Sequence, residues 1–161
     1  DAKNINILKK DNLALVTQTT LSVDETKSII KILKDRFPKI EVPKKDDICY
    51  ATQNRQDAVK QLALESDYMI VVGSKNSSNS NRLKELGEKC GCDSVLIDEF
   101  SDLNLEDLKN CKTISITAGA SAPESRVMEI AKSLENYFDA KLVESGHDNE
   151  DVYFKLPPGL R

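Results

Sequence analysis

The sequence predicts an α/β fold with mainly parallel sheets. Short apolar runs alternate with amphipathic helical segments along most of the 161 residues, and this alternation is typical of strand–helix–strand units. The run at 68–72 is continuously apolar, which indicates a strand buried on both faces, as in a parallel sheet. Right-handed crossovers then place the strand-to-helix loops on one edge of a sheet, where ligands bind in folds of this class.

The first 47 residues predict one helix between two short strands. Ser22 and Glu25 form an S-x-x-E capping box just before an amphipathic segment, and Pro38 cannot continue a helix, so it should end there. The expected elements are a strand at 13–16, a helix starting at 23, a possible strand at 40–43 and a charged turn at 44–47.

The rest of the chain repeats the pattern. Asn54 is a good helix N-cap, and Ser121 with Glu124 forms a second capping box. The expected elements are a short strand that ends at Cys49, a helix capped by Asn54, strands at 68–73, 94–97 and 113–116, helices at 82–89 and 103–108, a last helix after Ser121, and strand-like residues 152–154.

Composition and charge exclude several classes of function. The chain carries 23 basic and 27 acidic residues, a net charge of −4, and so lacks the basic excess typical of duplex-DNA binders. Its longest apolar stretch, around 68–72, is too short to span a bilayer. We therefore expect neither nucleic-acid nor membrane partners. Because the chain starts at Asp1 and runs straight into an apolar strand, we also expect it to be cut from a longer protein.

Three loops between predicted strands and helices are rich in hydroxyl and amide groups, namely 17–22, 74–81 and 117–121. Helix N-termini offer free N–H groups and a positive dipole end, so such loops suit a phosphate or diphosphate. Every residue of 74–81 except Lys75 is Ser or Asn, more than one cap requires. The other two loops are also explained by less specific roles, as helix caps at Ser22 and Ser121 and a polar turn at 17–20.

The four cysteines are expected to be reduced, because the chain is acidic and shows no secretory context. Cys90 and Cys92 have no second pair to complete a zinc site, and Cys111 suits a small buried hydrophobe. Cys49 is expected at the same edge as the polar loops, as a buried thiol, a nucleophile or a metal ligand with partners elsewhere. His147, the only histidine, lies in a polar stretch and suits a solvated loop.

Four segments, in order and with matching spacing, resemble the carboxyl-terminal half of the 4-hydroxy-3-methylbut-2-enyl diphosphate reductases. They are TQTTLS at 17–22, ICYATQNRQ at 48–56, VVGSKNSSNSNRL at 71–83 and TAGASAPE at 117–124. The resemblance runs from about residue 13 to the end of the chain. It implies parallel-sheet α/β units from a cloverleaf of three units around a central cavity, with about half of the enzyme present here.

This resemblance implies an iron–sulfur reductase. Such an enzyme converts (E)-4-hydroxy-3-methylbut-2-enyl diphosphate to isopentenyl diphosphate and dimethylallyl diphosphate by reductive dehydroxylation, the last step of the non-mevalonate pathway. Electrons would come from ferredoxin or flavodoxin through a 4Fe–4S cluster held by three cysteines, with one iron open to the substrate hydroxyl. The resemblance implies a bacterial cytoplasmic enzyme or one in the stroma of a plastid-type organelle.

The matching motifs also imply roles for individual residues. Ser77, Ser78 and Asn79 match the Ser-Ser-Asn that binds the diphosphate, and Ser121 matches the serine that completes this cradle. Thr19, with Thr20 beside it, matches the threonine near the substrate hydroxyl, and Cys49 matches the third cluster ligand.

The rest of the family's site is missing from this chain. The first two cluster cysteines, the substrate-binding histidines and the glutamate proton donor belong to the amino-terminal half, so no catalytic residue is expected here and the purified chain should be colourless. The resemblance divides the chain into the rear part of one unit at 1–44, a complete unit with Cys49 and the Ser/Asn loop at 45–125, and a helix-and-strand extension at 126–161. An alternative is a phosphate- or sugar-phosphate-binding α/β module without redox chemistry.

Overall fold

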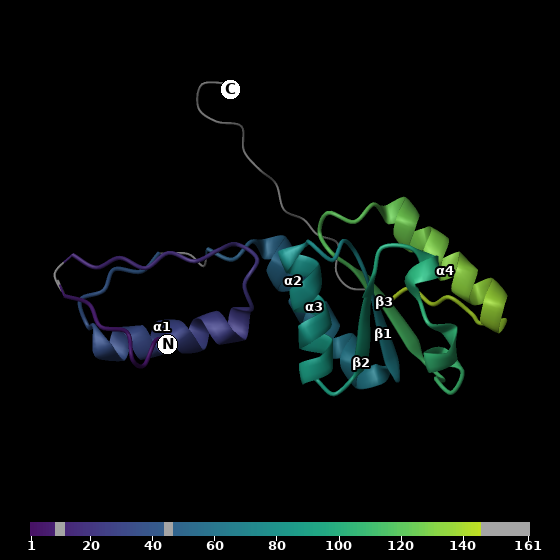
Figure 1. The fold of residues 1–161 in the computed structure, drawn as a ribbon, viewed down its shortest axis with the longest axis horizontal. Coiled ribbons are helices and arrows are strands. Elements are labelled where there is room, and N and C mark those ends of the chain that lie inside the picture. The colour runs from purple at the N-terminus through teal and green to yellow at the C-terminus, as the bar shows by residue number, and fades with distance from the viewer. Residues whose placement is uncertain (9–11, 44–46, 146–161) are drawn as a thin grey trace, which may run out of the picture.

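The computed structural model describes residues 1–8, 12–43 and 47–145 (Figure 1). The main elements of these ranges are, in chain order, α1 (Val23–Arg36), α2 (Tyr50–Glu65), β1 (Tyr68–Val72), α3 (Ser78–Lys89), β2 (Asp93–Ile97), β3 (Ile114–Ala118) and α4 (Glu124–Phe138). Two 3-10 turns, η1 (Phe100–Asp102) and η2 (Leu105–Leu108), connect β2 to β3. No helix within these ranges has the length and apolar character needed to cross a membrane.

The three strands form one parallel sheet in the order β2-β1-β3. Tyr68 at the start of β1 pairs in register with Asp93 of β2 and with Ile114 of β3. The next four residues of β1 are fully buried, as expected for a central strand covered on both faces. The α/β prediction with parallel strands is therefore confirmed.

Helices cover both faces of this sheet, α2 and α3 on one side and α4 on the other (Figure 1). Side chains of a strand alternate between faces, so Met69 and Val71 pack with α2 and α3, while Ile70 and Val72 pack with α4 and the 3-10 turns. Full burial of such a side chain stabilises a fold by about 1.5–3 kcal/mol. Residues 50–138 thus form an α/β unit with a core on each face.

Residues 12–43 form a separate amino-terminal lobe that extends to one side of the α/β unit (Figure 1). In this lobe α1 lies beside two extended segments joined by one parallel bridge between Ala14 and Glu41. The Leu15 amide donates to the Glu41 carbonyl and the Glu41 amide to the Leu13 carbonyl, both at 2.8 Å. The strands expected at 13–16 and 40–43 are thus reduced to one bridge, because a two-stranded ribbon is only marginally stable.

The predicted start of α1 is confirmed. Ser22 is the N-cap, and its hydroxyl accepts a hydrogen bond from the Glu25 amide at 3.4 Å. The helix ends at Arg36, two residues before Pro38. The capping box therefore located this start correctly from local chemistry alone.

Helix α2 begins earlier than predicted. Cys49 occupies its N-cap position, so the short strand expected to end at Cys49 and the cap expected at Asn54 were wrong. The amides three and four residues after Cys49 both donate to its carbonyl, at 2.9 and 3.0 Å. Helical hydrogen bonding therefore starts at Cys49, and the polar residues 52–54 belong to the first turns of α2.

Helix α3 also begins early, at Ser78 and not at residue 82. The Ser77 hydroxyl caps it by accepting from the Ser80 amide at 3.3 Å. Half of the Ser/Asn run is therefore helical, because one of its own serines provides the cap.

Helix α4 begins at Glu124 with Pro123 in the N-cap position, so the prediction that Ser121 caps this helix was wrong. Ser121 lies in a turn closed by a hydrogen bond of 3.0 Å from the Ala122 amide to the Gly119 carbonyl. The helix expected at 103–108 is replaced by η1 and η2. His147, the strand-like residues 152–154 and most of the turn at 44–47 lie outside the described residues, and the division of the chain at 45 and 126 stays a prediction.

Candidate functional site

The carboxyl ends of β1 and β3 meet at the sheet edge where α3 begins. Gly73, directly after β1, donates its amide to the Ile97 carbonyl at 2.8 Å, and Gly119, directly after β3, donates to the Val72 carbonyl at 2.9 Å. Both strand-to-helix loops therefore leave the sheet from fixed backbone positions. This is the edge where parallel α/β folds bind ligands.

The loop before α3 is held rigidly by its own side chains. The Asn81 amide group donates to the carbonyls of Lys75 and Ser77, both at 2.8 Å, and the Asn76 backbone amide donates to the Ser74 hydroxyl at 3.2 Å. These bonds fix the backbone that leads into the first turn of α3. The free N–H groups of that turn and the positive end of the helix dipole favour an anion.

Asn79 is the most informative side chain at this edge. It is only 5% exposed, yet neither its amide nitrogen nor its amide oxygen has a hydrogen-bond partner among the described residues. Leaving a buried polar group unpaired costs about 1–3 kcal/mol, and such exceptions in folded proteins call for an explanation. A bound ligand would supply the missing partners.

Thr19, Thr20 and Cys49 lie beside this loop although they are distant in sequence. The Thr20 hydroxyl donates to the Ser78 hydroxyl at 3.3 Å, and the Cys49 amide donates to the Thr19 carbonyl at 3.0 Å. The Cys49 side chain is exposed, so the interpretation of Cys49 as a buried thiol is wrong. The structure therefore brings these three predicted site residues together with Ser78, while Ser121 lies exposed on the neighbouring loop after β3.

Gln56 of α2 holds the threonine loop against the α/β unit, a role that sequence reasoning missed. Its side chain accepts from the Val23 amide at 3.0 Å and donates to the Leu21 carbonyl at 2.9 Å. Gln56 is only 2% exposed. The sequence indicates the burial of Gln56 only through its spacing from other buried positions of α2. These positions are Thr52, Gln56, Val59 and Ala63, which form one helical face.

Ion pairs join the same lobe to α2 and α3. Lys60 lies 2.8 Å from a carboxylate oxygen of Asp24, and this hydrogen bond lowers the pKa of Asp24 below its ordinary value. Glu25 pairs with Lys89, whose hydrogen bond likewise lowers the pKa of Glu25. Arg82 lies 2.6 Å from Glu85 and 4.0 Å from Glu25, so its charge is already paired and Lys75 is the exposed cation of the loop.

The other cysteines lie outside this arrangement. Cys92 is buried, its thiol directed at the Ser66 carbonyl at 3.5 Å, and burial raises the pKa of this thiol. Cys90 and Cys111 are partly buried. Within residues 1–8, 12–43 and 47–145, no three His, Cys, Asp or Glu side chains are gathered so as to hold a metal ion.

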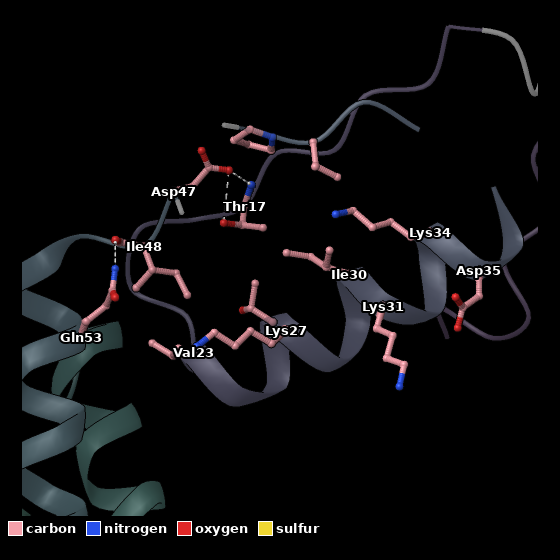
Figure 2. Close-up of a pocket in the computed structure, with 13 residues that line it drawn as sticks. Thr17, Val23, Lys27, Ile30, Lys31, Lys34, Asp35, Asp47, Ile48 and Gln53 are labelled. Carbon is pink, nitrogen blue, oxygen red and sulfur yellow. Dashed lines mark hydrogen bonds between the residues drawn. The ribbon is translucent and has the colours of Figure 1, made fainter. Parts of the chain in front are cut away.

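A pocket of about 350 Å³ lies elsewhere, between α1 and the extended segments of the lobe (Figure 2). Figure 2 shows Ile30 projecting from α1 on one side and Thr17 and Asp47 joined by hydrogen bonds on the other. None of the predicted site residues lines it. Thr17 and Asp47 in this pocket are hydrogen-bonded to each other, whereas Asn79 has no partner among the described residues. We therefore place the candidate site at the sheet edge.

The fold and the site define a parallel α/β protein whose sheet edge carries a Ser/Asn-rich helix start. The family model described as LytB protein matches residues 1–135. The chain belongs to this LytB protein family.

Relatives and solved structures agree with this membership. The 4-hydroxy-3-methylbut-2-enyl diphosphate reductase of Saccharophagus degradans is 52% identical over all 161 residues, which cover 52% of that relative. The solved structure of the E-1-hydroxy-2-methyl-but-2-enyl-4-diphosphate reductase from Plasmodium falciparum is 35% identical, with a TM-score of 0.85 over 99% of this chain and 51% of that one. The chain thus spans about half the length of the relatives it matches.

Proposed function

We propose that this chain is one half of a 4-hydroxy-3-methylbut-2-enyl diphosphate reductase and that its sheet edge binds the diphosphate of the allylic substrate. The observation that carries the proposal is Asn79, a buried amide without a partner among the described residues, in the first turn of α3. A diphosphate accepts hydrogen bonds from several donors. Ser77, Ser78 and Asn79 would supply them from one loop and Ser121 from the next.

Thr19 and Thr20 would act at the other end of the substrate. The hydrogen bond from Thr20 to Ser78, at 3.3 Å, ties the threonine loop to the diphosphate loop, so both would be ordered around one ligand. Because Gln56 fixes the same loop through two backbone hydrogen bonds, little reorganisation is needed on binding. Pre-ordered donors of this kind bind more tightly than donors that must first be ordered.

Cys49 fits the role of one cluster ligand. Its thiol is exposed, it is linked to Thr19 by a backbone hydrogen bond of 3.0 Å, and it lies at the start of α2, whose positive dipole end suits an anionic ligand. A bound 4Fe–4S cluster would supply the electrons and an open iron for the hydroxyl group. The other two ligands and the proton donor would come from the other half of the enzyme, since no metal-holding group of residues occurs in the described ranges.

The remaining partners follow from this proposal. The electron donor would be ferredoxin or flavodoxin, and the products isopentenyl and dimethylallyl diphosphate. The compartment would be the bacterial cytoplasm or a plastid-type stroma. The alternative, a phosphate-binding module without redox chemistry, would use the same sheet edge and leave the exposed Cys49 without a role.

A titration of the full chain with inorganic pyrophosphate tests the anion site. We expect Asn79→Ala to weaken binding by about 10- to 100-fold, because a hydrogen bond to a charged group contributes about 1.5–3 kcal/mol. The same change should leave the free energy of unfolding unchanged or higher, since it removes an unpaired buried amide. The matched control is Asn136→Ala on the exposed side of α4. Equal affinity of Asn79→Ala and the parent chain would overturn the proposal.

A further inference from the structure

We infer that Ser80 is a positioning residue that sets the spacing between the two loops of the proposed diphosphate site. This inference rests on the proposed function and deepens it. Ser80 is fully buried in the first turn of α3. Its hydroxyl oxygen has no hydrogen-bond partner in the part of the chain that the structure describes. The position of the Ser80 hydroxyl group is therefore determined by the atoms that it packs against.

Ser80 packs against two glycines, each directly after a strand. A Cβ atom at Gly73 or at Gly119 would collide with the Ser80 hydroxyl oxygen, and would lie only 3.0 or 3.3 Å from the Ser80 Cβ. The two glycines leave a space at the sheet edge, and the Ser80 side chain fills it. Neither glycine has a positive φ, so the close approach of Ser80, and not backbone conformation, is what requires glycine there.

This packing connects the two binding loops through the sheet. Gly73 and Gly119 are each held by a backbone hydrogen bond to a neighbouring strand, at 2.8 and 2.9 Å, so Ser80 rests on two fixed points. Ser78 and Asn79 precede Ser80 in α3, after the N-cap Ser77, and the Gly119 carbonyl closes the turn that carries Ser121. The Ser80 side chain therefore fixes where the first loop stands relative to the second.

Substitution of the glycine tests this role. In the full chain, we expect Gly119→Ala to weaken binding of inorganic pyrophosphate at least tenfold, because its Cβ displaces Ser80 and with it the start of α3. Adding Ser80→Gly removes the two side-chain atoms that the new Cβ meets and leaves only the Ser80 Cα at 3.8 Å, an ordinary contact. Because the new methyl group then fills the space that the Ser80 side chain leaves, we expect the double variant to bind within about threefold of the parent. Rescue of this kind is the signature of two residues in contact.

A matched pair at the opposite end of α3 separates positioning from stability. A Cβ at Gly87 would collide with the Ser94 hydroxyl oxygen in the same way, at the amino-terminal end of β2. Gly87→Ala should lower the melting temperature and leave pyrophosphate affinity unchanged. Ser94→Gly should restore part of the lost stability, since the Met69 sulfur still lies 3.3 Å from the new Cβ.

Each outcome of this experiment is decisive. If the parent chain fails to bind pyrophosphate, the proposed function fails and the role of Ser80 with it. If the parent binds and folded Gly119→Ala binds equally well, or if Ser80→Gly restores nothing, the positioning role alone is overturned. If Gly119→Ala does not fold, the single variant Ser80→Gly decides the question. Ser80→Gly must then bind pyrophosphate severalfold more weakly than the parent chain, while Gly87→Ala keeps the affinity of the parent chain.

Discussion

The buried polar residues Gln56, Asn79 and Ser80 differ in whether their side chains have hydrogen-bond partners among the described residues. A polar side chain inside a protein normally has a hydrogen-bond partner within the fold, and Gln56 obeys this rule with two backbone partners. Asn79 and Ser80 do not obey it among the described residues. The contrast separates two roles, because Gln56 organises the threonine loop whereas the buried amide of Asn79 in the first turn of α3 has no partner among the described residues.

Loss of Gln56 should loosen the threonine loop locally. We expect Gln56→Leu to raise the hydrogen-exchange rate of the Val23 amide roughly tenfold or more, because an amide or carbonyl left without its partner costs about 1–3 kcal/mol. Gln61→Leu, an exposed position on the same helix, should leave this rate unchanged. Equal exchange in the two variants would show that Gln56 does not hold the loop.

At residue level, composition could indicate the candidate site but not the residues that support it. The density of Ser and Asn in 74–81 is visible in the sequence, and it marks a helix start that one cap does not explain. The supporting roles of Gln56 and Ser80 depend on burial and on glycines far along the chain. No local pattern contains that information, since it arises only when β1 and β3 pair.

Among the elements, apolar runs located the strands of the sheet more accurately than capping residues located the starts of α2 and α3. The three strands of the sheet coincide with short apolar runs, and β1, the central strand, is buried on both faces. The starts of α2 and α3 were placed too late, since polar residues 52–54 and 78–81 are helical and not part of loops. Ser, Thr and Asn suit both caps and loops, so their local preference could not decide between the two.

The start of the sheet depends on Asp67, which joins β1 to β3. Its carboxylate accepts hydrogen bonds from the amides of Lys112 and Thr113, at 2.7 and 3.0 Å, and these bonds lower the pKa of Asp67. A carboxylate with a lowered folded-state pKa stabilises the fold above its unfolded-state pKa, near 4, and loses this effect as the pH falls through the folded-state value.

We therefore expect Asp67→Asn to be less stable than the parent at neutral pH. The difference should be constant above about pH 5 and disappear at acidic pH, once the parent carboxylate is protonated. Urea unfolding of both proteins across this pH range measures the difference in stability. Asp93→Asn is the control, because Asp93 is an exposed carboxylate at the same amino-terminal end of the strands. A stability difference that stays the same down to pH 2 would contradict the role of the charge.

For the whole molecule, burial is uneven between its two parts. Four consecutive residues of β1 are fully buried in the α/β unit, whereas only Thr26 and Phe37 are buried among residues 12–43. Val16 of the lobe is 81% exposed. The α/β unit thus has its own core, and the lobe is joined to it by the hydrogen bonds of Gln56 and of Thr20 with Ser78 and by the ion pairs of Asp24 and Glu25. This unevenness fits the proposal that the chain is one half of a longer reductase.

The iron content of this half tests that proposal for the complete enzyme. Purified and reconstituted with iron and sulfide, the chain alone should remain colourless, because the proposal gives this chain one ligand, Cys49, and a 4Fe–4S cluster needs several thiolates. The complete reductase, with the other half joined to this chain, should show the visible absorption of a cluster. Cys49→Ser should abolish that absorption, whereas Cys111→Ser, a partly buried thiol outside the site, should retain it. A brown protein from this chain alone would refute the division of ligands between two halves, and a coloured Cys49→Ser enzyme would show that Cys49 is not a required cluster ligand.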